Sequence, residues 1–254
     1  MLEISGLTKY FGGVAAVREV NFKVGRGEIF ALIGPNGAGK TTVFNLITGM
    51  LKPDCGTMVF EGKNISGIRP NRVAAAGVAR TFQNLQLFGS MTVLENIMAG
   101  AHLRSREGFL KSLVSRPGMS EEEKRLRAEA RVVLQETGLA GRADLPAAAL
   151  SFGQQRLLEV ARAVASGARL ILLDEPAAGL NGAEAKVLSG YLKRLQEQGR
   201  SMILVEHDMK TVMETAGRIL VLNFGAVIAE GTPAEIQADP QVIKAYLGED
   251  ERVA

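Results

Sequence analysis

A glycine-rich segment between two apolar stretches constrains the fold of this chain more than any other feature. Residues 34–41 read Gly-Pro-Asn-Gly-Ala-Gly-Lys-Thr, which fits the pattern G-x-x-x-x-G-K-[ST]. The preceding residues 27–34 form an apolar run typical of a buried parallel strand, and residues 43–47 supply the apolar face of a helix. A buried strand, a glycine-rich loop and a helix in this order predict an α/β fold.

The residue types of this segment suit the binding of a phosphate chain. Glycines allow successive backbone amides to point inward, and the start of the following helix adds the positive end of its dipole. The Lys40 ammonium would reach the β- and γ-phosphates, and the Thr41 hydroxyl would bind Mg²⁺. The residues expected to bind a nucleotide are Gly34, Pro35, Asn36, Gly37, Ala38, Gly39, Lys40, Thr41 and Thr42.

An acidic pair follows a second apolar run. Residues 170–173 are Leu-Ile-Leu-Leu, and Asp174 and Glu175 come directly after them. In open α/β sheets, ligands bind at the carboxyl ends of the strands. Asp174 would therefore hold Mg²⁺ through its water shell, and Glu175 would polarise an attacking water as a general base.

Short aliphatic runs alternate with helical stretches along most of the chain. We expect strands at residues 57–60, 170–173, 202–205 and 219–222, and a half-buried strand where apolar and polar residues alternate over 20–25. Strands that alternate with helices predict a mainly parallel sheet covered on both faces.

The middle third has a different pattern, with no strand predicted over residues 92–138. Ser120 and Glu123 form a capping box, and residues 104–118 have the composition of a surface insertion. The helix that follows the capping box has an apolar face made of Leu126, Ala130, Val133 and Leu134. We therefore expect a helical subdomain inserted into an α/β core.

Composition excludes several kinds of site. One cysteine, Cys55, rules out an internal disulfide and a multi-cysteine zinc site, and two histidines are too few for a histidine-rich metal centre. The longest stretch without a charged residue, 81–94, contains polar residues and is shorter than the ~20 apolar residues of a membrane-spanning helix. The net charge of +3 is too small to argue for or against a nucleic-acid partner.

Further segments resemble the motifs of ATP-binding cassette (ABC) proteins and occur in that family's order. Residues 150–156, Leu-Ser-Phe-Gly-Gln-Gln-Arg, are similar to the signature sequence, which is usually Leu-Ser-Gly-Gly-Gln. Gln83 resembles the Q-loop glutamine, His207 the switch histidine, and residues 179–181 the D-loop. Phe11 resembles the aromatic residue that stacks on adenine, with Tyr10 as the alternative.

The resemblance implies ATP and Mg²⁺ as ligands and ATP hydrolysis as the activity. The implied fold is an α/β P-loop NTPase core with a mainly parallel sheet, an antiparallel β subdomain and an inserted helical subdomain. Catalytic roles are implied for Glu175, His207 and Gln83, and Mg²⁺ contacts for Thr41, Gln83 and Asp174.

The resemblance also implies that two cassettes pair head to tail and enclose ATP between them. The phosphate loop of each would face the signature turn of the other, so Ser151, Gly153 and Gln154 would contact the nucleotide. Two residues depart from the family pattern. Phe152 replaces the first glycine of the signature pair and bears on affinity and dimer geometry, whereas Asn181 replaces the usual D-loop aspartate but keeps a hydrogen-bonding side chain.

Within the family, the chain is similar to the ATPases of branched-chain amino acid importers, especially their high-affinity "G" subunit. The likeness to these importer ATPases rests on residues 80–88, 91–97, 205–209, 231–236 and 245–249. The likeness to the "G" subunit rests on the long insertion before Ser120 and on residues 152–156, Phe-Gly-Gln-Gln-Arg. The ATPases of urea or amide importers and of lipopolysaccharide export share part of these motifs and are the alternatives.

This likeness implies one ABC ATPase domain over residues 1–254, with a core of about 1–80 and 155–254 and a helical part of about 84–154. The partners implied are a second ATPase subunit, either identical or a sister chain, transmembrane permease subunits and, indirectly, a solute-binding protein, but no nucleic acid. The implied location is peripheral, on the cytoplasmic face of a prokaryotic inner membrane.

Residues 85–100 would form the groove that receives a coupling helix of the permease. Its apolar members are either groove lining or core, and they are Leu87, Phe88, Val93 and Ile97. Two other classes are less compatible with the motifs. A small-molecule kinase would not need the signature turn or His207, and a non-hydrolysing scaffold could lose Glu175, which is present.

Overall fold

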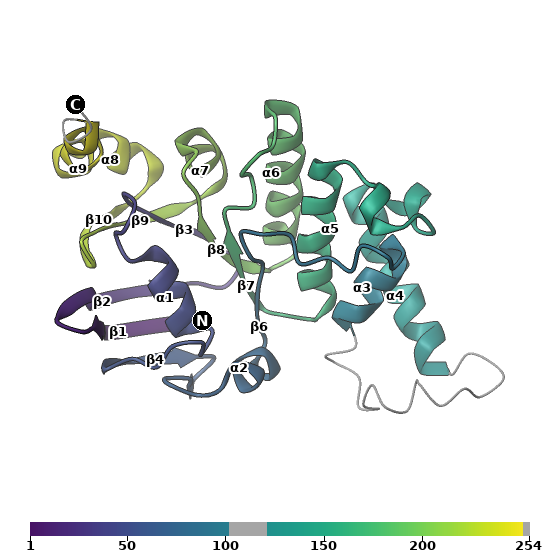
Figure 1. Cartoon of the computed structure of the whole chain (residues 1–254), viewed down its shortest axis with the longest axis horizontal. Coiled ribbons are helices and arrows are strands. Elements are labelled where there is room, and N and C mark those ends of the chain that lie inside the picture. Colours follow the sequence, from purple (N-terminus) through teal and green to yellow (C-terminus); the bar gives the residue numbers. More distant parts are fainter. Residues whose placement is uncertain (102–120, 251–254) are drawn as a thin grey trace.

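The computed structural model describes residues 1–101 and 121–250. Within them the chain forms one six-stranded and one four-stranded sheet, with helices against both faces of the larger sheet (Figure 1).

The six-stranded sheet has the order β10-β9-β3-β8-β7-β6. Strands β9, β3, β8, β7 and β6 run parallel, and β10 pairs antiparallel with β9 at one edge. Every residue of β3, β7 and β8 is buried, because both faces of this sheet are covered. The strands are β3 (Ile29–Ile33), β6 (Val78–Arg80), β7 (Leu170–Asp174), β8 (Ser201–Val205), β9 (Arg218–Asn223) and β10 (Ala226–Gly231).

The four-stranded sheet is antiparallel and has the order β2-β1-β4-β5. Together with α1 it covers one face of the larger sheet, where Phe22 of β2 stacks on Phe30 of β3 with ring centroids 5.2 Å apart. Its strands are β1 (Leu2–Phe11), β2 (Val14–Val24), β4 (Cys55–Phe60) and β5 (Lys63–Asn64), and the helices on this side are α1 (Lys40–Ile47) and α2 (Pro70–Ala76).

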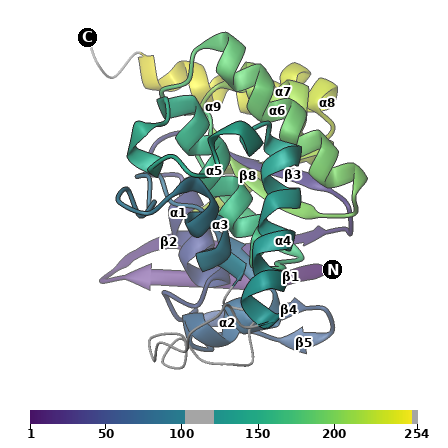
Figure 2. The same ribbon diagram turned by 90° about the vertical axis from the view of Figure 1, so that its right-hand side faces the viewer.

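The opposite face of the large sheet packs on helices. Ile29, Ala31 and Ile33 alternate along β3 with the residues of the first face, and they share a second core with helical residues. Helices α3, α4 and α5 pack on one another and contribute residues to this second core (Figure 2). The remaining elements are α3 (Val93–Ala101), α4 (Glu121–Thr137), α5 (Phe152–Ala165), α6 (Gly182–Glu197), α7 (Met209–Thr215), α8 (Pro233–Ala238), α9 (Pro240–Asp250) and the 3₁₀ turns Ala140–Arg142 and Ala147–Ala149.

The predicted α/β fold with a mainly parallel sheet and an antiparallel β subdomain is confirmed. Each predicted strand lies within or overlaps an observed one. Strands β1, β5, β6 and β10 were not predicted, and β5 and β6 have too few residues for a periodic pattern. One face of the large sheet is covered by the antiparallel sheet and α1 rather than by helices alone.

The predicted amphipathic helix is α4, and its residues Leu126, Ala130 and Leu134 are buried. In the described part of residues 92–138 no strand is formed. Ser120 of the expected capping box, and the expected surface insertion at 104–118, lie outside the described residues. Helix α5 runs continuously across residue 155, and the division of the chain into a core and an inserted helical part stays a prediction.

No helix in the described part of the chain combines the length and the apolar character that a membrane span requires.

Candidate nucleotide-binding and catalytic site

The glycine-rich loop connects the buried strand β3 to the first residue of α1, as predicted. The Lys40 ammonium is buried and donates to the carbonyl oxygens of Gly34 at 2.6 Å and Pro35 at 2.9 Å. Inside the loop, the amide of Ala38 donates to the Pro35 carbonyl at 3.1 Å. The loop is therefore a closed turn around its lysine, at the positive end of the helix dipole.

Two glycines of the loop are required by its packing. A Cβ on Gly34, whose φ is 148°, would lie 2.1 Å from the carbonyl oxygen of Leu222 on β9. A Cβ on Gly39, whose φ is 104°, would lie 2.4 Å from the carbonyl oxygen of Ala16 on β2. The loop thus passes between the two sheets at distances that leave no room for a side chain at these positions.

Phe11 lies at the tip of the β1–β2 hairpin, whose second strand packs against this loop. The backbone of Phe11 pairs with Val14, and the next pair along the hairpin is Tyr10 with Ala15. The following residue of β2, Ala16, lies against Gly39 of the loop. The side chains of Phe11 and Tyr10 are each 48% exposed, so both can be reached by a base. The exposures of the two rings are equal and leave the choice between them open.

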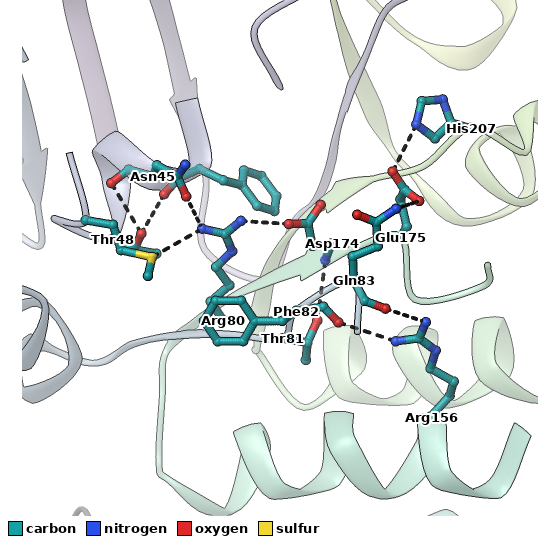
Figure 3. A network of polar contacts seen from close by, with 12 residues as sticks. Asn45, Thr48, Arg80, Thr81, Phe82, Gln83, Arg156, Asp174, Glu175 and His207 are labelled. Atoms are coloured by element: carbon teal, nitrogen blue, oxygen red, sulfur yellow. Dashed lines mark hydrogen bonds and ion pairs between the residues drawn. The ribbon is translucent and has the colours of Figure 1, made fainter. Parts of the chain in front are cut away.

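Glu175 lies at the carboxyl end of β7 with both carboxylate oxygens in contact. Its Oε2 accepts a hydrogen bond from Gln83 Nε2 at 3.1 Å, and its Oε1 lies 3.0 Å from His207 Nε2 (Figure 3). The structure therefore brings together the three residues for which catalytic roles were expected, from the ends of β6, β7 and β8. Glu175 has a φ of 49°, a left-handed conformation that is uncommon for a non-glycine residue.

Asp174 is buried and forms an ion pair that the sequence did not reveal. Its Oδ2 accepts from Arg80 Nη2 at 2.7 Å, and Arg80 Nη1 donates to Asn45 Oδ1 on α1 at 2.6 Å (Figure 3). Arg80 stood in the motif that carried the family resemblance, but no pattern connected it to a residue 94 positions later. The parallel pairing of β6 with β7 makes that connection.

The signature residues begin helix α5. Ser151 is its N-cap, with Oγ accepting from the Gln154 amide at 3.4 Å, and Gln154 Oε1 accepts from the Ser151 amide at 3.1 Å. A capped serine can still donate through its hydroxyl hydrogen. In Figure 1, α5 and the phosphate loop before α1 lie on different sides of β7 and β8, so this turn does not cover the loop of its own chain.

Two buried charged residues of α5 hold the segment that carries Gln83. Arg156 donates to the carbonyl oxygens of Gln83 at 2.7 Å and Phe82 at 3.4 Å, and it pairs with Glu159 at 3.3 Å. Glu159 also accepts from the Gln86 amide at 3.3 Å, and burial raises the pKa of its carboxyl group. Sequence reasoning missed both residues because they lie on the core side of a helix whose other positions follow an ordinary apolar pattern.

Glu206, which precedes His207, was also missed. Its carboxylate is buried and accepts from the Ala177 amide at 2.6 Å and the His207 amide at 3.2 Å. Burial raises the pKa of Glu206, against the opposing effect of these two amide donors. Glu206 thus connects the backbone amide of Ala177, two residues after Glu175, to the backbone amide of His207.

The two departures from the family pattern have clear local roles. The Phe152 ring lies over the guanidinium of Arg156, with 5.2 Å between ring centroid and Cζ, and it packs against Gly179, where a Cβ would lie 3.0 Å from the ring. Asn181 is the N-cap of α6, with Oδ1 accepting from the Ala183 and Glu184 amides at 3.0 Å. Asn181 therefore retains the capping function that an aspartate would have there.

The oxygen donors at the end of β7 suit a hard divalent cation. Asp174 has one carboxylate oxygen outside its ion pair, Gln83 has its amide oxygen outside the bond to Glu175, and Thr41 is exposed at the start of α1. Within residues 1–101 and 121–250, no three acidic, histidine or cysteine side chains form a metal-binding group. Few protein ligands and phosphate oxygens together are the usual shell of Mg²⁺, so the donor set fits this ion.

The apolar residues of the expected coupling groove fall into two groups. Val93 and Ile97 are fully buried, so for these two residues the core alternative is the correct one. Phe88 is 51% exposed, with the Arg162 guanidinium over its ring at 5.6 Å, and Leu87 is partly buried. Val93 and Ile97 lie four residues apart on the buried face of α3, whereas Leu87 and Phe88 precede this helix, where helical periodicity does not apply.

The sequence matches two protein families and closely resembles characterised transport proteins. Residues 17–178 match the ABC transporter family, and residues 226–252 match the branched-chain amino acid ATP-binding cassette transporter family. The chain is 44% identical to the high-affinity branched-chain amino acid transport ATP-binding protein BraF of Pseudomonas aeruginosa and 42% identical to LivG of Escherichia coli K12, over 98% of each chain.

Solved structures agree with these matches. The ADP conformation of MJ1267, an ATP-binding cassette of an ABC transporter, has a TM-score of 0.85 and 33% identity over 98% of both chains. The dimeric cassette MJ0796 bound to ADP and phosphate has a TM-score of 0.73 and 27% identity over 92% of this chain and 99% of the other. The chain therefore belongs to the ATP-hydrolysing cassettes of the ABC transporter family.

Proposed function

We propose that this chain powers a membrane importer of branched-chain amino acids by hydrolysing ATP between two cassettes. The observation that carries the catalytic part is the contact of Glu175 with both Gln83 and His207, at the carboxyl edge of the sheet where the phosphate loop also begins. The solute class rests on the BraF and LivG relatives and on the match of residues 226–252.

In the proposed reaction, the phosphate loop and Lys40 hold the phosphate chain of ATP and withdraw charge from its terminal phosphate. Glu175 accepts a proton from the attacking water, and the contacts from Gln83 and His207 keep its carboxylate in place. Thr41, Asp174 and Gln83 would hold Mg²⁺. Once bound, this ion neutralises negative charge on the phosphates.

The proposed working form is a head-to-tail pair, with an identical copy or a sister ATPase. Ser151 and Phe152 are exposed at the N-terminus of α5, where the hydroxyl of Ser151 and the positive end of the helix dipole can meet an anion. A single cassette leaves the terminal phosphate half in solvent, whereas a second one supplies donors on the other side. Phe11 would stack on the adenine at the rim of each site.

The test of the pair is the variant Glu175→Gln, which keeps the shape of the side chain and removes its basicity. With ATP, we expect this variant to elute as a dimer in gel filtration, and the parent chain to return to monomer as it hydrolyses ATP. Glu197→Gln, at the end of α6, is the matched control and should behave as the parent. A Glu175→Gln chain that binds ATP yet stays monomeric argues against the sandwich, unless a sister subunit is needed.

Purification from membranes decides whether the working pair needs a sister ATPase subunit. We expect the chain to co-purify with permease subunits and a second ATPase, as a peripheral component that alkaline or high-salt washing releases. Proteoliposomes made from this complex should accumulate labelled leucine, isoleucine and valine with internal ATP. Uptake of urea or an amide instead, or extraction of a lipid, would assign the chain to a different transport system.

A further inference from the structure

Arg80 is a buried arginine at the centre of the site, and the reaction outlined above gives it no role. Its side chain is 7% exposed, and the side chain of its partner Asp174 is 9% exposed. The guanidinium lies between two aromatic rings, with Cζ 5.4 Å from the Phe44 centroid and 5.1 Å from the Phe82 centroid. A charge held this firmly in a buried place requires an explanation, because burying an ion pair seldom stabilises a fold.

The two terminal nitrogens of Arg80 contact two different elements. Nη1 donates to Asn45 on α1 and Nη2 to Asp174 at the end of β7, so one planar group bridges the phosphate-loop helix and the acidic strand (Figure 3). The Nε atom of Arg80 is buried without a hydrogen-bond partner in the described residues. The arginine thus leaves one donor unsatisfied while it maintains this bridge.

The bridge connects the helix that carries Thr41 to Asp174, and both residues are expected to contact Mg²⁺. Thr41 and Asn45 are four residues apart on α1 and share a helix face. Asp174 Oδ2 accepts from Arg80 Nη2 at 2.7 Å, and this short contact orients the carboxylate and with it the direction of Oδ1. Arg80 therefore determines how the Asp174 carboxylate faces the helix that carries Thr41.

We propose that Arg80 is a positioning residue for the cation site, which acts by bridging Asn45 and Asp174. This proposal rests on the proposed ATPase function and adds a specific consequence. Arg80 should affect the binding of nucleotide with Mg²⁺ and leave the binding of nucleotide without Mg²⁺ unchanged, because the hydrogen bonds of Lys40 to the Gly34 and Pro35 carbonyls, which shape the phosphate loop, do not involve Arg80.

A simple charge effect would act in the opposite direction. Loss of a positive charge beside Asp174 strengthens the attraction of that carboxylate for a cation, whereas loss of orientation weakens the site. Arg80→Lys separates the two effects, because a lysine keeps the charge but its single ammonium lacks the planar, two-nitrogen geometry of the bridge. Asn45→Ala opens the other end of the bridge and leaves both Arg80 and Asp174 intact.

The experiment measures the affinity of a fluorescent, non-hydrolysable ATP analogue for the full chain, with excess Mg²⁺ and with EDTA. The readout is the ratio of the two affinities. We expect Arg80→Lys and Asn45→Ala each to lower this ratio about tenfold, or about 1.4 kcal/mol. The affinity in EDTA should change less than about twofold, and the double variant should be no worse than Arg80→Lys, because both changes break one bridge.

Arg218→Lys is the matched control. Arg218 also pairs with two carboxylates, those of Glu28 and Glu230, and lies over the ring of Phe30 at 5.0 Å. It begins β9, whereas Asp174 ends the parallel strand β7, so it lies at the opposite edge of the sheet. This variant should leave the ratio unchanged.

Three results would overturn the positioning role. An unchanged ratio in Arg80→Lys and Asn45→Ala, with a higher ratio in Arg80→Gln, would show that only charge matters. An equal loss of affinity with Mg²⁺ and with EDTA would show general damage to the fold, as would a drop in the unfolding midpoint far beyond that of Arg218→Lys. A parent chain that binds the analogue under neither condition would instead refute the proposed ATPase function itself.

Discussion

His207 Nε2 lies 3.0 Å from Glu175 Oε1, although the two residues follow different strands and are 32 positions apart in the chain. Gln83 occupies the other oxygen of the same carboxylate at 3.1 Å. A carboxylate held at both oxygens has a defined direction, which a general base needs before it can take a proton from a water in line with a phosphate. The backbone of Glu175 is held as well, by its amide donating to the Val205 carbonyl at 2.9 Å.

Replacement of His207 by alanine should slow hydrolysis and leave nucleotide binding intact. The variant loses the contact to Glu175 Oε1 but none of the phosphate-loop contacts, so we expect kcat to fall on the order of 10²-fold with little change in KM. Phosphate release at steady state measures both constants. Lys210→Ala, on the exposed side of α7, is the control. A wild-type kcat in His207→Ala would refute the role of this contact.

Arg156 and Glu159 should behave as one buried unit. Arg156→Met removes the donor to Gln83 and leaves the Glu159 carboxylate buried without its cation, so the free energy of unfolding should fall by about 3 kcal/mol. Adding Glu159→Gln removes the buried charge, which then has only Arg162 as a nearby cation, and should recover part of that loss. Urea unfolding of the two single variants and the double variant measures the coupling, and purely additive effects would contradict it.

Two glycines of the phosphate loop should respond differently to the same change. A Cβ on Gly37, at φ 77°, meets nothing within 4 Å, so Gly37→Ala should cost only about 1 kcal/mol from its left-handed backbone. A Cβ on Gly39 would lie 2.4 Å from the Ala16 carbonyl oxygen, so Gly39→Ala should cost about 3 kcal/mol or more and disturb the loop. Thermal unfolding and ATP binding of the two variants test this order, and equal losses would contradict it.

A negative charge at Phe88 should uncouple transport from hydrolysis. The ring is 51% exposed on the segment proposed to meet the permease, so Phe88→Glu should keep ATP binding and basal hydrolysis and abolish solute uptake by the reconstituted complex. Ile97→Glu is the contrasting variant, because Ile97 is fully buried and a charge there should unfold the helical group. Loss of nucleotide binding in Phe88→Glu would mean that this ring is structural.

The buried Glu206 carboxyl group should give the stability of the folded chain a specific pH dependence. Burial raises its folded-state pKa above the ordinary value of 4.5, and nearby Glu175 and Asp208 raise it further, whereas the amides of Ala177 and His207 lower it. The folded chain therefore binds this proton more tightly than the unfolded chain. The contribution of Glu206 to stability is fully present below about pH 4.5 and is lost as the pH rises through its folded-state pKa.

Urea unfolding of the parent chain and Glu206→Gln at several pH values isolates this contribution. The difference in unfolding free energy, parent minus variant, should decrease as the pH rises above about 4.5. The parent chain alone cannot give this result, because other groups change the unfolding free energy with pH in the opposite direction. The Thr211 hydroxyl, for example, lowers the pKa of Asp208. A difference that is constant with pH would contradict the raised pKa of Glu206.

Much of this protein could be inferred from local patterns. The phosphate loop, the acidic end of the Leu170–Leu173 run and the capped start of the signature helix are each defined by adjacent residues. Short-range physics acts on each of them directly: glycine permits the turn, an aliphatic run forms a buried strand, and serine caps a helix. The order of these segments along the chain was sufficient to indicate the family and, with it, the expected site residues.

The contacts that connect those segments were decided by the tertiary structure. Arg80 meets Asp174 because β6 lies beside β7 in the sheet, and Arg156 meets Gln83 because α5 packs under the segment that follows β6. Strand order and helix packing result from burial summed over the whole core, so no local pattern encodes which charged residue will face which partner. The same reason explains why Phe88 is exposed and Ile97 is buried, although both belong to one apolar segment.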